Sequence, residues 1–326
     1  MSEPRTGNRP PPRPAEAPLR RPGALLAALV DRARGLPPVR MGVVHPCDAP
    51  SLQGALAAGE NRLIVPTLIG PRGKIEAVAE AGGLTLEGVE IVDAPYSHAA
   101  AAAAIDMVRR GRLQAVMKGS LHTDEVMHAV VREGAGLRTE RRISHVFAID
   151  TPGYHKLLLV TDAAINIAPS LDEKRDIIRN AIDLAQAIGV ERPKVAILSA
   201  VETVEGKIPS TIQAAALCKM ADRGQITGAD LDGPLAFDNA ISRLAAEQKN
   251  ICSVVAGDPD ILIAPDLEAG NILAKELVFL AGADTAGLVL GARVPIVLTS
   301  RADDVDSRVA SCALAQLFAH RVRAAI

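Results

Sequence analysis

The sequence predicts an α/β protein whose strands form a parallel, doubly wound sheet. Short apolar runs that suit buried strands alternate with longer segments in which apolar residues recur at helical intervals. The chain has 326 residues, more than the roughly 100–200 that one domain usually holds, so two domains are expected. Hydrophobic residues make up 48% of the chain and aromatic residues only 2%. The cores must therefore be built from Ala, Val, Leu and Ile.

The predicted elements follow one another from residue 23 onward. Residues 1–22 are rich in Pro and Arg and cannot bury enough apolar surface to offset the entropy of ordering, which predicts a disordered tail. Strands rich in Val, Ile and Leu are expected at 40–44, 63–69, 89–93, 115–117, 144–149, 156–161, 194–200, 261–264, 286–290 and 296–298. Helices with apolar residues at intervals of three and four are expected at 23–35, 51–58, 74–81, 98–110, 124–133, 171–188, 210–223, 238–249, 268–280 and from 305 onward.

The runs at 144–149 and 156–161 stand apart because no predicted helix separates them. Pro152 and Gly153 lie between them, and these two residue types together favour a tight turn. The sequence therefore predicts either a hairpin or a paired crossing into a second domain at this point.

Composition disfavours several classes of function. Thirty-six basic and 38 acidic residues give a formal net charge of −2. With no broad basic surface and few aromatic rings to stack on bases, no nucleic-acid partner is expected. The longest early apolar run, residues 24–30, is far too short to span a bilayer, so a soluble, cytoplasmic protein is expected. The four cysteines are scattered without CxxC or metal-ligand spacing, which favours reduced thiols and no metal site.

The polar turn after the last expected strand is the first candidate site. Ser300 and Arg301 follow strand 296–298 almost directly. Ligands of open α/β sheets bind at the carboxyl ends of strands, beside helix N-termini, and an Arg there can hold a phosphate through two nitrogens. The alternative is a purely structural turn, with Ser300 as helix N-cap and Asp303 as its capping-box partner. Further carboxylates follow at Asp304 and Asp306.

A second candidate turn joins strand 115–117 to helix 124–133 and contains Lys118, Gly119, Ser120 and His122. A Gly lets the backbone approach an anion, and consecutive N–H groups at a helix start can hold phosphate oxygens. The residue order is not that of a P-loop. The alternative is an ordinary capped helix, with Thr123 as N-cap and Lys118 exposed.

A third candidate is the basic run that contains Arg138, Arg141 and Arg142. It would suit a clamp for a multiply charged ligand, although charge runs usually lie on a solvated face. Single histidines in this region, such as His145, are more often structural than metal-binding. The sequence contains no GxSxG, HExxH or GxGxxG motif, which disfavours a serine hydrolase, a zinc protease and a standard dinucleotide site.

Taken in order, these turns resemble the phosphate acetyl/butyryltransferase family. The resemblance runs from about residue 38 to the end of the chain. Six ordered motifs carry it: Lys118-Gly-Ser-Leu-His-Thr-Asp124, Gly136-Leu-Arg-Thr139, Ser144-His-Val146, Thr161-Asp-Ala-Ala-Ile-Asn166, Asp232-Gly-Pro-Leu-Ala236 and Leu298-Thr-Ser-Arg-Ala-Asp303. The likeness is strongest to phosphate butyryltransferases and to the phosphate acetyltransferase part of bifunctional enoyl-CoA hydratase fusions.

The resemblance implies two α/β domains of the isocitrate/isopropylmalate dehydrogenase-like type with a cleft between them. The first would comprise residues 23–150 plus 290–326, and the second residues 151–289. It also implies a homodimer. The implied reaction is reversible transfer of an acetyl or other short acyl group between CoA and phosphate, giving an acyl phosphate, with no further cofactor.

The resemblance also implies roles for residues. Ser300 and Arg301 correspond to the family's catalytic pair, and acetyl-specific members carry a catalytic Asp seven residues after that Ser. Position 307 is Ser here, so Asp306 is assigned, with Asp303 and Asp304 as rivals. As the thiol attacks the acyl phosphate, Asp306 would accept its proton, Arg301 would neutralise the leaving phosphate and Ser300 would donate a hydrogen bond. Direct transfer in a ternary complex needs no covalent enzyme intermediate.

CoA and phosphate would be bound by the turn of Lys118, Gly119, Ser120 and His122 together with Arg138 and Arg141. Acetyl-specific members carry an Arg where this chain has Met127, and Arg138 or Arg141 would replace its contact. This departure favours the butyryl-like branch.

Three alternatives remain open. The first is specificity for butyryl groups, because one methylene in a pocket is worth only about 1–3 kcal/mol and the sequence does not set pocket volume. The second is a metal- and NAD-dependent hydroxy-acid dehydrogenase on the same fold, which would need carboxylates from separate elements rather than one turn. The third is a non-catalytic CoA-binding module.

Overall fold

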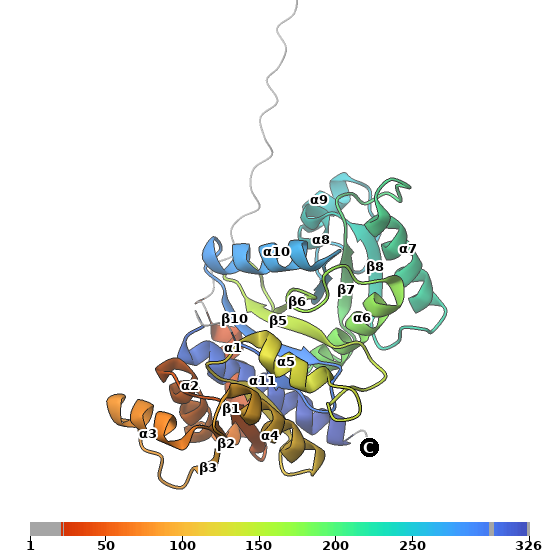
Figure 1. Ribbon diagram of the computed structural model, residues 1–326. Helices are drawn as coiled ribbons and strands as arrows, with labels where there is room; N and C mark the ends of the chain where they lie inside the picture. The colour runs from red at the N-terminus through yellow and green to blue at the C-terminus, as the bar shows by residue number, and fades with distance from the viewer. Residues whose placement is uncertain (1–20, 22, 300–302, 325–326) are drawn as a thin grey trace, which may run out of the picture.

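The structure, a computed structural model, describes Arg21, residues 23–299 and residues 303–324. Apart from Arg21, the predicted disordered tail lies outside the described residues, as do Ser300 and Arg301. The described strands form one sheet of 11 strands in the order β3-β2-β1-β4-β11-β10-β5-β6-β9-β7-β8, with helices on both faces (Figure 1). This mixed α/β architecture agrees with the predicted fold class.

Five parallel strands form the first half of the sheet: β1 (Val39–Val44), β2 (Ile64–Gly70), β3 (Glu90–Asp93), β4 (Ala115–Lys118) and β11 (Ile296–Val297). The helices between the first four and after β4 are α2 (Ala49–Glu60), α3 (Arg72–Ala81), α4 (Ser97–Arg109) and α5 (Thr123–Val131). The chain runs outward from β1 to β3 and then returns to place β4 on the other side of β1. This reversal makes a topological switch point between the carboxyl ends of β1 and β4, where α/β sheets commonly bind ligands.

The second half of the sheet contains β6 (Leu158–Thr161), β7 (Lys194–Leu198), β8 (Asp230–Leu235) and β9 (Ile261–Ile263), which are parallel to one another. The helices of this half are α6 (Leu171–Ala187), α7 (Pro209–Asp222), α8 (Phe237–Ile241), α9 (Arg243–Gln248) and α10 (Leu267–Phe279). The single helix predicted over 238–249 is divided at Ser242, whose hydroxyl accepts a hydrogen bond from the N–H of Ala245 and caps α9.

Two central strands, β5 (Ser144–Asp150) and β10 (Asp284–Leu290), join the halves. β10 pairs antiparallel with β5 and β11, and β5 pairs antiparallel with β6. The hairpin through Pro152 and Gly153 is thereby confirmed, and the doubly wound sheet is parallel on both sides of these central strands. The segments between β5 and β6 and between β10 and β11 are too short for the crossover that parallel neighbours require.

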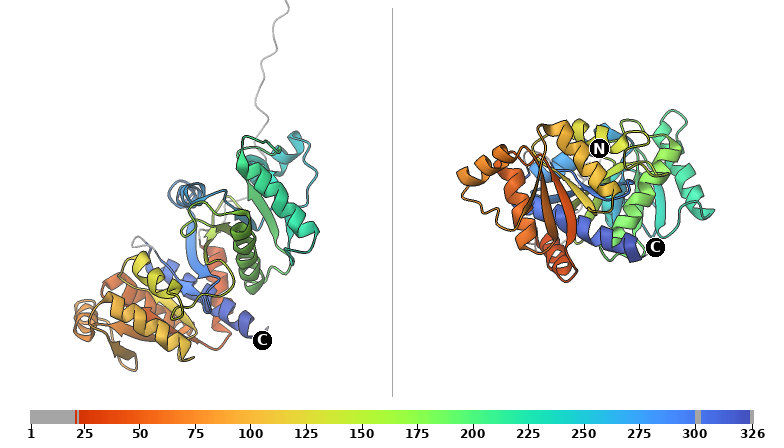
Figure 2. Two further views of the ribbon diagram at one scale, coloured as in Figure 1. Left: turned by 45° about the vertical axis from the view of Figure 1, so that its right-hand side comes forward. Right: turned by 60° about the horizontal axis from the view of Figure 1, so that its bottom comes forward.

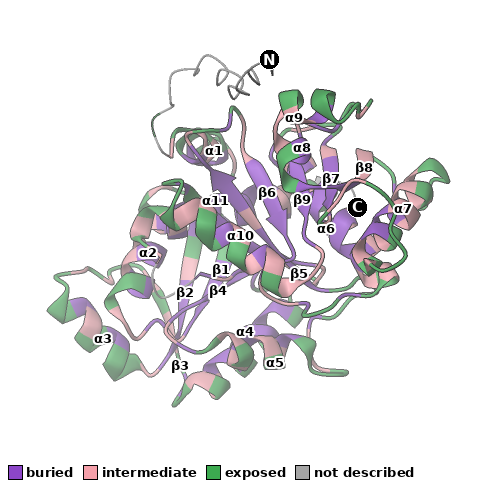
Figure 3. Ribbon diagram, turned by 90° about the horizontal axis from the view of Figure 1, so that it is seen from above, coloured by how far each residue is buried: buried purple, intermediate pink, exposed green. Residues whose placement is uncertain are grey.

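The core lies on both faces of the sheet. Helices α1 (Ala24–Arg34), α2, α6, α7 and α11 (Val305–Ala324) supply buried residues to one cluster, and α4 and α5 pack in a second. The strands are largely buried between helices whose outer surfaces are exposed (Figure 3). The β1–β4 part and the α6–β8 part lie at opposite ends of the molecule, with β10 and α11 between them (Figure 2).

One continuous sheet crosses the boundary near residue 150. The division into residues 23–150 plus 290–326 and residues 151–289 therefore stays a prediction. None of the described helices has both the length and the apolar character needed to cross a bilayer.

Candidate functional site

Lys118 is the last residue of β4 and lies at the switch point. Its side chain is only 5% exposed, which contradicts the alternative of an exposed lysine. The Nζ atom donates hydrogen bonds to the carbonyl oxygens of Gly119, at 3.3 Å, and Leu121, at 3.1 Å. These carbonyls hold a buried positive charge at the carboxyl end of the sheet, directly before α5.

Gly119 lets this turn lie directly on the end of β1. A Cβ atom at position 119 would be 2.4 Å from the carbonyl oxygen of Val44 and 2.6 Å from that of His45. The N–H of Gly119 donates to Val44, and the N–H of Ser120 donates to His45, each at 2.9 Å. These two N–H groups are therefore used within the protein, and the expected phosphate cradle of consecutive amides does not form from them.

The Ser120 side chain braces the turn against the loop that follows β1. Its hydroxyl donates to the carbonyl oxygen of His45 at 2.8 Å and accepts from the N–H of Cys47 at 3.2 Å. The same oxygen lies 3.1 Å from Nδ1 of His45. Because the hydroxyl proton is already used, we assign the proton of that contact to Nδ1.

His45 was not identified from the sequence. It has a positive φ of 54°, a conformation uncommon for residues other than Gly and often found at functional sites. Burial, and then the charge of Lys74, lower its pKa below the usual 6.5, against the opposing charge of Glu125. The only available signal was a histidine placed directly after an expected strand.

His122 precedes the first residue of α5 and is its N-cap. Its N–H donates to Oε1 of Glu125 at 3.1 Å, and Glu125 also accepts a hydrogen bond from the hydroxyl of Ser97. Thr123 already belongs to the helix, so the alternative of Thr123 as N-cap was wrong. The network ties the start of α5 to the start of α4.

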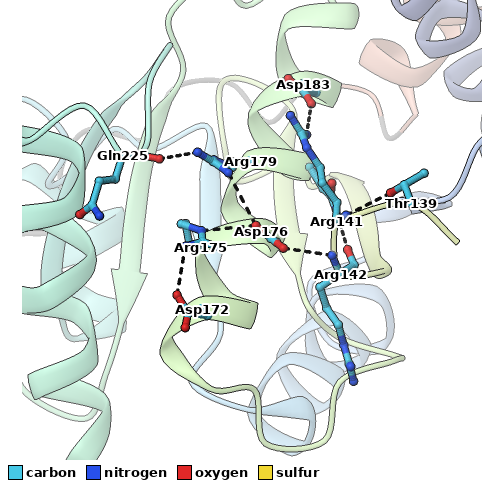
Figure 4. Close-up of polar contacts among 10 residues, drawn as sticks. Thr139, Arg141, Arg142, Asp172, Arg175, Asp176, Arg179, Asp183 and Gln225 are labelled. Atoms are coloured by element: carbon cyan, nitrogen blue, oxygen red, sulfur yellow. Dashed lines mark hydrogen bonds and ion pairs between the residues drawn. The ribbon is translucent and has the colours of Figure 1, made fainter.

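Two arginines of the basic run are paired with acidic groups of α6 (Figure 4). The Arg141 guanidinium forms an ion pair with Asp183. The backbone N–H of Arg142 donates to Asp176 at 3.1 Å, and its Nη1 lies 3.0 Å from a carboxylate oxygen of Glu173. These contacts fix the run against α6 and engage much of its charge.

Arg138 differs from its two neighbours in the run. Its residue is exposed, and within the described part of the chain its guanidinium has no ion pair. It lines a pocket of about 480 Å³ with Met127, Ile143 and Ile165, next to the carboxylates at the start of α6. Of the two arginines predicted to bind CoA or phosphate, Arg138 is thus the one whose charge is available to a ligand.

Asp306 lies in the first turn of α11 and is exposed. It lines a different pocket, of about 590 Å³, together with Asp284 and Asp304. Burial, and then the charges of Asp304, Asp150 and Asp306, raise the pKa of Asp284. Asp304 accepts the N–H of Ser307 at 2.8 Å and thereby caps α11. The structure thus groups the carboxylates with one another and not with Arg138.

The His145 side chain is buried beneath the end of β11. Burial lowers its pKa to about 4, against the opposing effects of Asp162 and the carbonyl of Leu298. Neither ring nitrogen makes a hydrogen bond of regular geometry with a described residue, so the Leu298 carbonyl acts on the ring mainly through its partial charge. His145 is therefore a neutral ring next to the predicted catalytic turn.

Comparison with known proteins places these turns in a family. The family model "Phosphate acetyl/butaryl transferase" matches residues 96–316, which include all three candidate turns. The chain belongs to the phosphate acetyl/butaryl transferase family. Its membership confirms the resemblance found from the six motifs, and the chain is accordingly an acyltransferase.

Three relatives show how closely this transferase matches. A phosphate acetyltransferase from Rhizobium meliloti is 63% identical over 297 residues, covering 91% of this chain and 94% of the relative. A phosphate butyryltransferase from Clostridium acetobutylicum is 41% identical over 272 residues, covering 83% and 90%. The solved structure of a branched-chain phosphotransacylase from Enterococcus faecalis V583 superposes with a TM-score of 0.76 at 28% identity, covering 86% of this chain and 99% of that one.

Proposed function

We propose that this transferase moves an acetyl group, or another short acyl group, reversibly between CoA and inorganic phosphate, giving an acyl phosphate. The observation that carries the proposal is the buried ammonium of Lys118 at the switch point. A positive charge there, at the N-terminal end of a helix, suits anionic ligands such as phosphate and CoA. The names of the 63% and 41% identical relatives support the same reaction.

In this proposal the turn from Lys118 to His122 supplies charge and shape rather than an amide cradle. Lys118 attracts the anionic substrate, while Gly119 and Ser120 hold the turn against β1. Arg138 contacts a phosphate group of CoA or the free phosphate. Arg141 holds the basic run against α6 through its ion pair with Asp183. Charge-assisted hydrogen bonds from an arginine are short and strong, which suits such a ligand.

The chemical step is assigned to the turn after β11. Arg301 binds the phosphoryl oxygens, Ser300 donates a hydrogen bond to the developing oxyanion or the thiol sulfur, and Asp306 takes the thiol proton as the sulfur attacks the acyl carbon. The bond from the acyl carbon to phosphate oxygen breaks in the same complex. No cofactor beyond the substrates CoA and phosphate is required.

Acetyl is the acyl group that the relatives favour, since identity is 63% to an acetyltransferase and 41% to a butyryltransferase. Met127 instead favours butyryl specificity, because an apolar residue in the pocket of Arg138 suits a longer acyl chain. Identity over most of the chain outweighs one residue, so acetyl-CoA is the proposed substrate.

We also propose that the enzyme is a cytoplasmic homodimer. Helix α10 exposes Ile272 and Phe279, and its C-cap residue Leu280 is also exposed; the exposed fractions of Phe279 and Leu280 are 76% and 80%. Ile272 and Leu280 line an apolar pocket of about 760 Å³, and exposed apolar patches of this kind mark association surfaces. A monomeric mass in light scattering would contradict this part of the proposal.

The experiment for the function is CoA release from acetyl-CoA, propionyl-CoA and butyryl-CoA, each with and without phosphate. Phosphate-dependent release is expected, with the highest kcat/KM for acetyl-CoA. CoA binding without release would favour a binding module, and metal-dependent reduction of NAD by a hydroxy acid would favour a dehydrogenase. Failure of phosphate to stimulate release from all three thioesters would reject the proposal.

A further inference from the structure

Thr299 is the last described residue before Ser300, and a buried arginine holds it. Thr299 is 2% exposed, and Arg308, in the first turns of α11, is 3% exposed. The Nη1 atom of Arg308 donates a hydrogen bond to the Thr299 hydroxyl at 2.6 Å. A charged donor makes this bond stronger than one between neutral groups. The segment directly after β11 is thereby tied to α11.

Helix α2 directs the Arg308 side chain towards Thr299. A Cβ atom on Gly54 would lie 2.6 Å from Cδ of Arg308 and 2.9 Å from its Cβ. The two helices therefore meet at Gly54, and any larger residue there would collide with the arginine stem. Packing on the stem restricts the rotamers of Arg308 and fixes where its guanidinium lies.

Leu298, the residue before Thr299, has a buried neighbour on another strand, His145 of β5. Gly287 of β10 leaves room for the ring of His145, since a Cβ there would lie 2.9 Å from Nε2 of His145 and 3.1 Å from the Leu298 carbonyl oxygen. The Phe147 ring packs edge-on against His145, with centroids 4.3 Å apart. Leu298 thus lies beside the buried His145 ring of β5, whereas Thr299 is held by the hydrogen bond from Arg308 of α11.

We propose that Arg308 is a positioning residue for acyl transfer. It holds the Thr299 hydroxyl, two residues after β11, and with it the segment from which the chain continues to Ser300 and Arg301. The inference rests on the proposed function, because it gives Arg308 a role only if that turn carries the chemistry. Arg308 itself is too deeply buried in the described structure to be assigned a substrate contact.

A positioning role predicts a loss of turnover rather than of binding. Misplacement of catalytic groups by about 1 Å can cost about 10²-fold in rate, so Arg308→Gln is expected to lower kcat about 10–100-fold. The KM for CoA should stay within about twofold, because an interaction that acts on the reacting geometry alone leaves ground-state binding unchanged. Arg308→Lys, which keeps a charged donor, should recover part of the loss.

The matched control is Cys312→Ala. Cys312 lies one turn further along α11, is fully buried, and contacts Met41 through sulfur at 3.9 Å. Its truncation should lower Tm through lost packing, as Arg308→Gln does, yet leave kcat unchanged. Thr299→Val should reproduce the kcat loss of Arg308→Gln, and the double variant should be no slower than the slower single variant, because both changes remove the same bond.

The outcomes separate this inference from the proposed function. A kcat for Arg308→Gln equal to that of Cys312→Ala, in an active wild type, would overturn the inference alone. An inactive wild type would reject the proposed function. Hydrogen exchange of the peptide 296–306 would then test whether Arg308 anchors this segment. We expect at least about tenfold faster exchange in Arg308→Gln than in Cys312→Ala, since lost anchoring lowers local opening energies. Equal exchange in the two variants would overturn the anchoring role.

Discussion

Replacing Gly119 by Ala tests the packing of the Lys118 turn on β1. The added methyl group would sit 2.4 Å from the Val44 carbonyl oxygen and 2.6 Å from that of His45. Backbone atoms cannot swing away as side chains do, so the turn must retreat by about 1 Å to restore van der Waals contact. The retreat stretches the two 2.9 Å hydrogen bonds that Gly119 and Ser120 donate to Val44, the last residue of β1, and to His45, which follows it.

The expected cost follows from that displacement. Overpacking of this kind destabilises proteins by about 1–3 kcal/mol, and a shift of about 1 Å in substrate-binding groups lowers turnover by about 10²-fold. We therefore expect Gly119→Ala to lower kcat/KM for phosphate-dependent CoA release about 100-fold, with a Tm decrease of several degrees. Both quantities are measured on the same preparation.

Gly73→Ala is the matched control for this substitution. Gly73 lies in α3, and a Cβ atom there would have no neighbour within 4 Å. Gly73 is the second residue of the helix, where alanine is favoured over glycine by less than the roughly 1 kcal/mol of a helix interior, so this variant should be at least as stable and fully active. If Gly119→Ala keeps nearly normal kcat/KM, the turn does not position the substrate and the reasoning is refuted.

Three further predictions concern single side chains. Arg138→Gln should raise the KM for CoA or phosphate about 10–100-fold, which corresponds to the loss of a charge-assisted hydrogen bond of about 1.5–3 kcal/mol. Arg141→Gln should raise the KM less, because the Arg141 guanidinium already pairs with Asp183. A larger KM increase in Arg141→Gln than in Arg138→Gln would contradict the assignment. Arg301→Ala should lower kcat about 10²–10³-fold, as expected for loss of one charge stabiliser, and steady-state kinetics with near-normal turnover would remove Arg301 from the mechanism. His145 has a folded pKa of about 4, below its usual 6.5, so its contribution to stability is complete above pH 6.5 and is lost as the pH falls towards 4. Between pH 7 and pH 5 the free energy of unfolding should therefore fall about 2 kcal/mol more in wild type than in His145→Phe, and equal falls in denaturant titrations would show that the ring is not buried as described.

Much of the fold was predictable because the strands are short apolar runs separated by helices of clear periodicity. The edge strand β8 was missed because Asp232, Gly233 and Pro234 look like a turn. Proline lacks a donor and is tolerated in an edge strand, and β8 is the last strand of the sheet. The antiparallel direction of β10 was not predicted. The alternation of strands and helices does not indicate strand direction where a short link, such as residues 291–295, joins two strands without a helix.

The candidate site was only partly predictable. Lys118 and Gly119 stood out because a charged residue and a glycine follow an apolar run. The brace between Ser120 and His45 did not, because it joins residues 75 positions apart and depends on how two loops meet. Arg308 also escaped notice, since a charged residue in a helix usually faces solvent, and its burial here depends on a glycine in α2.

The most direct test of direct acyl transfer is isotope exchange between labelled phosphate and acetyl phosphate, measured with and without CoA. Transfer in a ternary complex predicts rapid exchange with CoA and none without it, because only the CoA thiol can hold the acyl group while phosphate leaves. Exchange in the absence of CoA would reveal an acyl-enzyme intermediate and contradict the mechanism. No exchange under either condition would contradict the assignment as a phosphate acyltransferase.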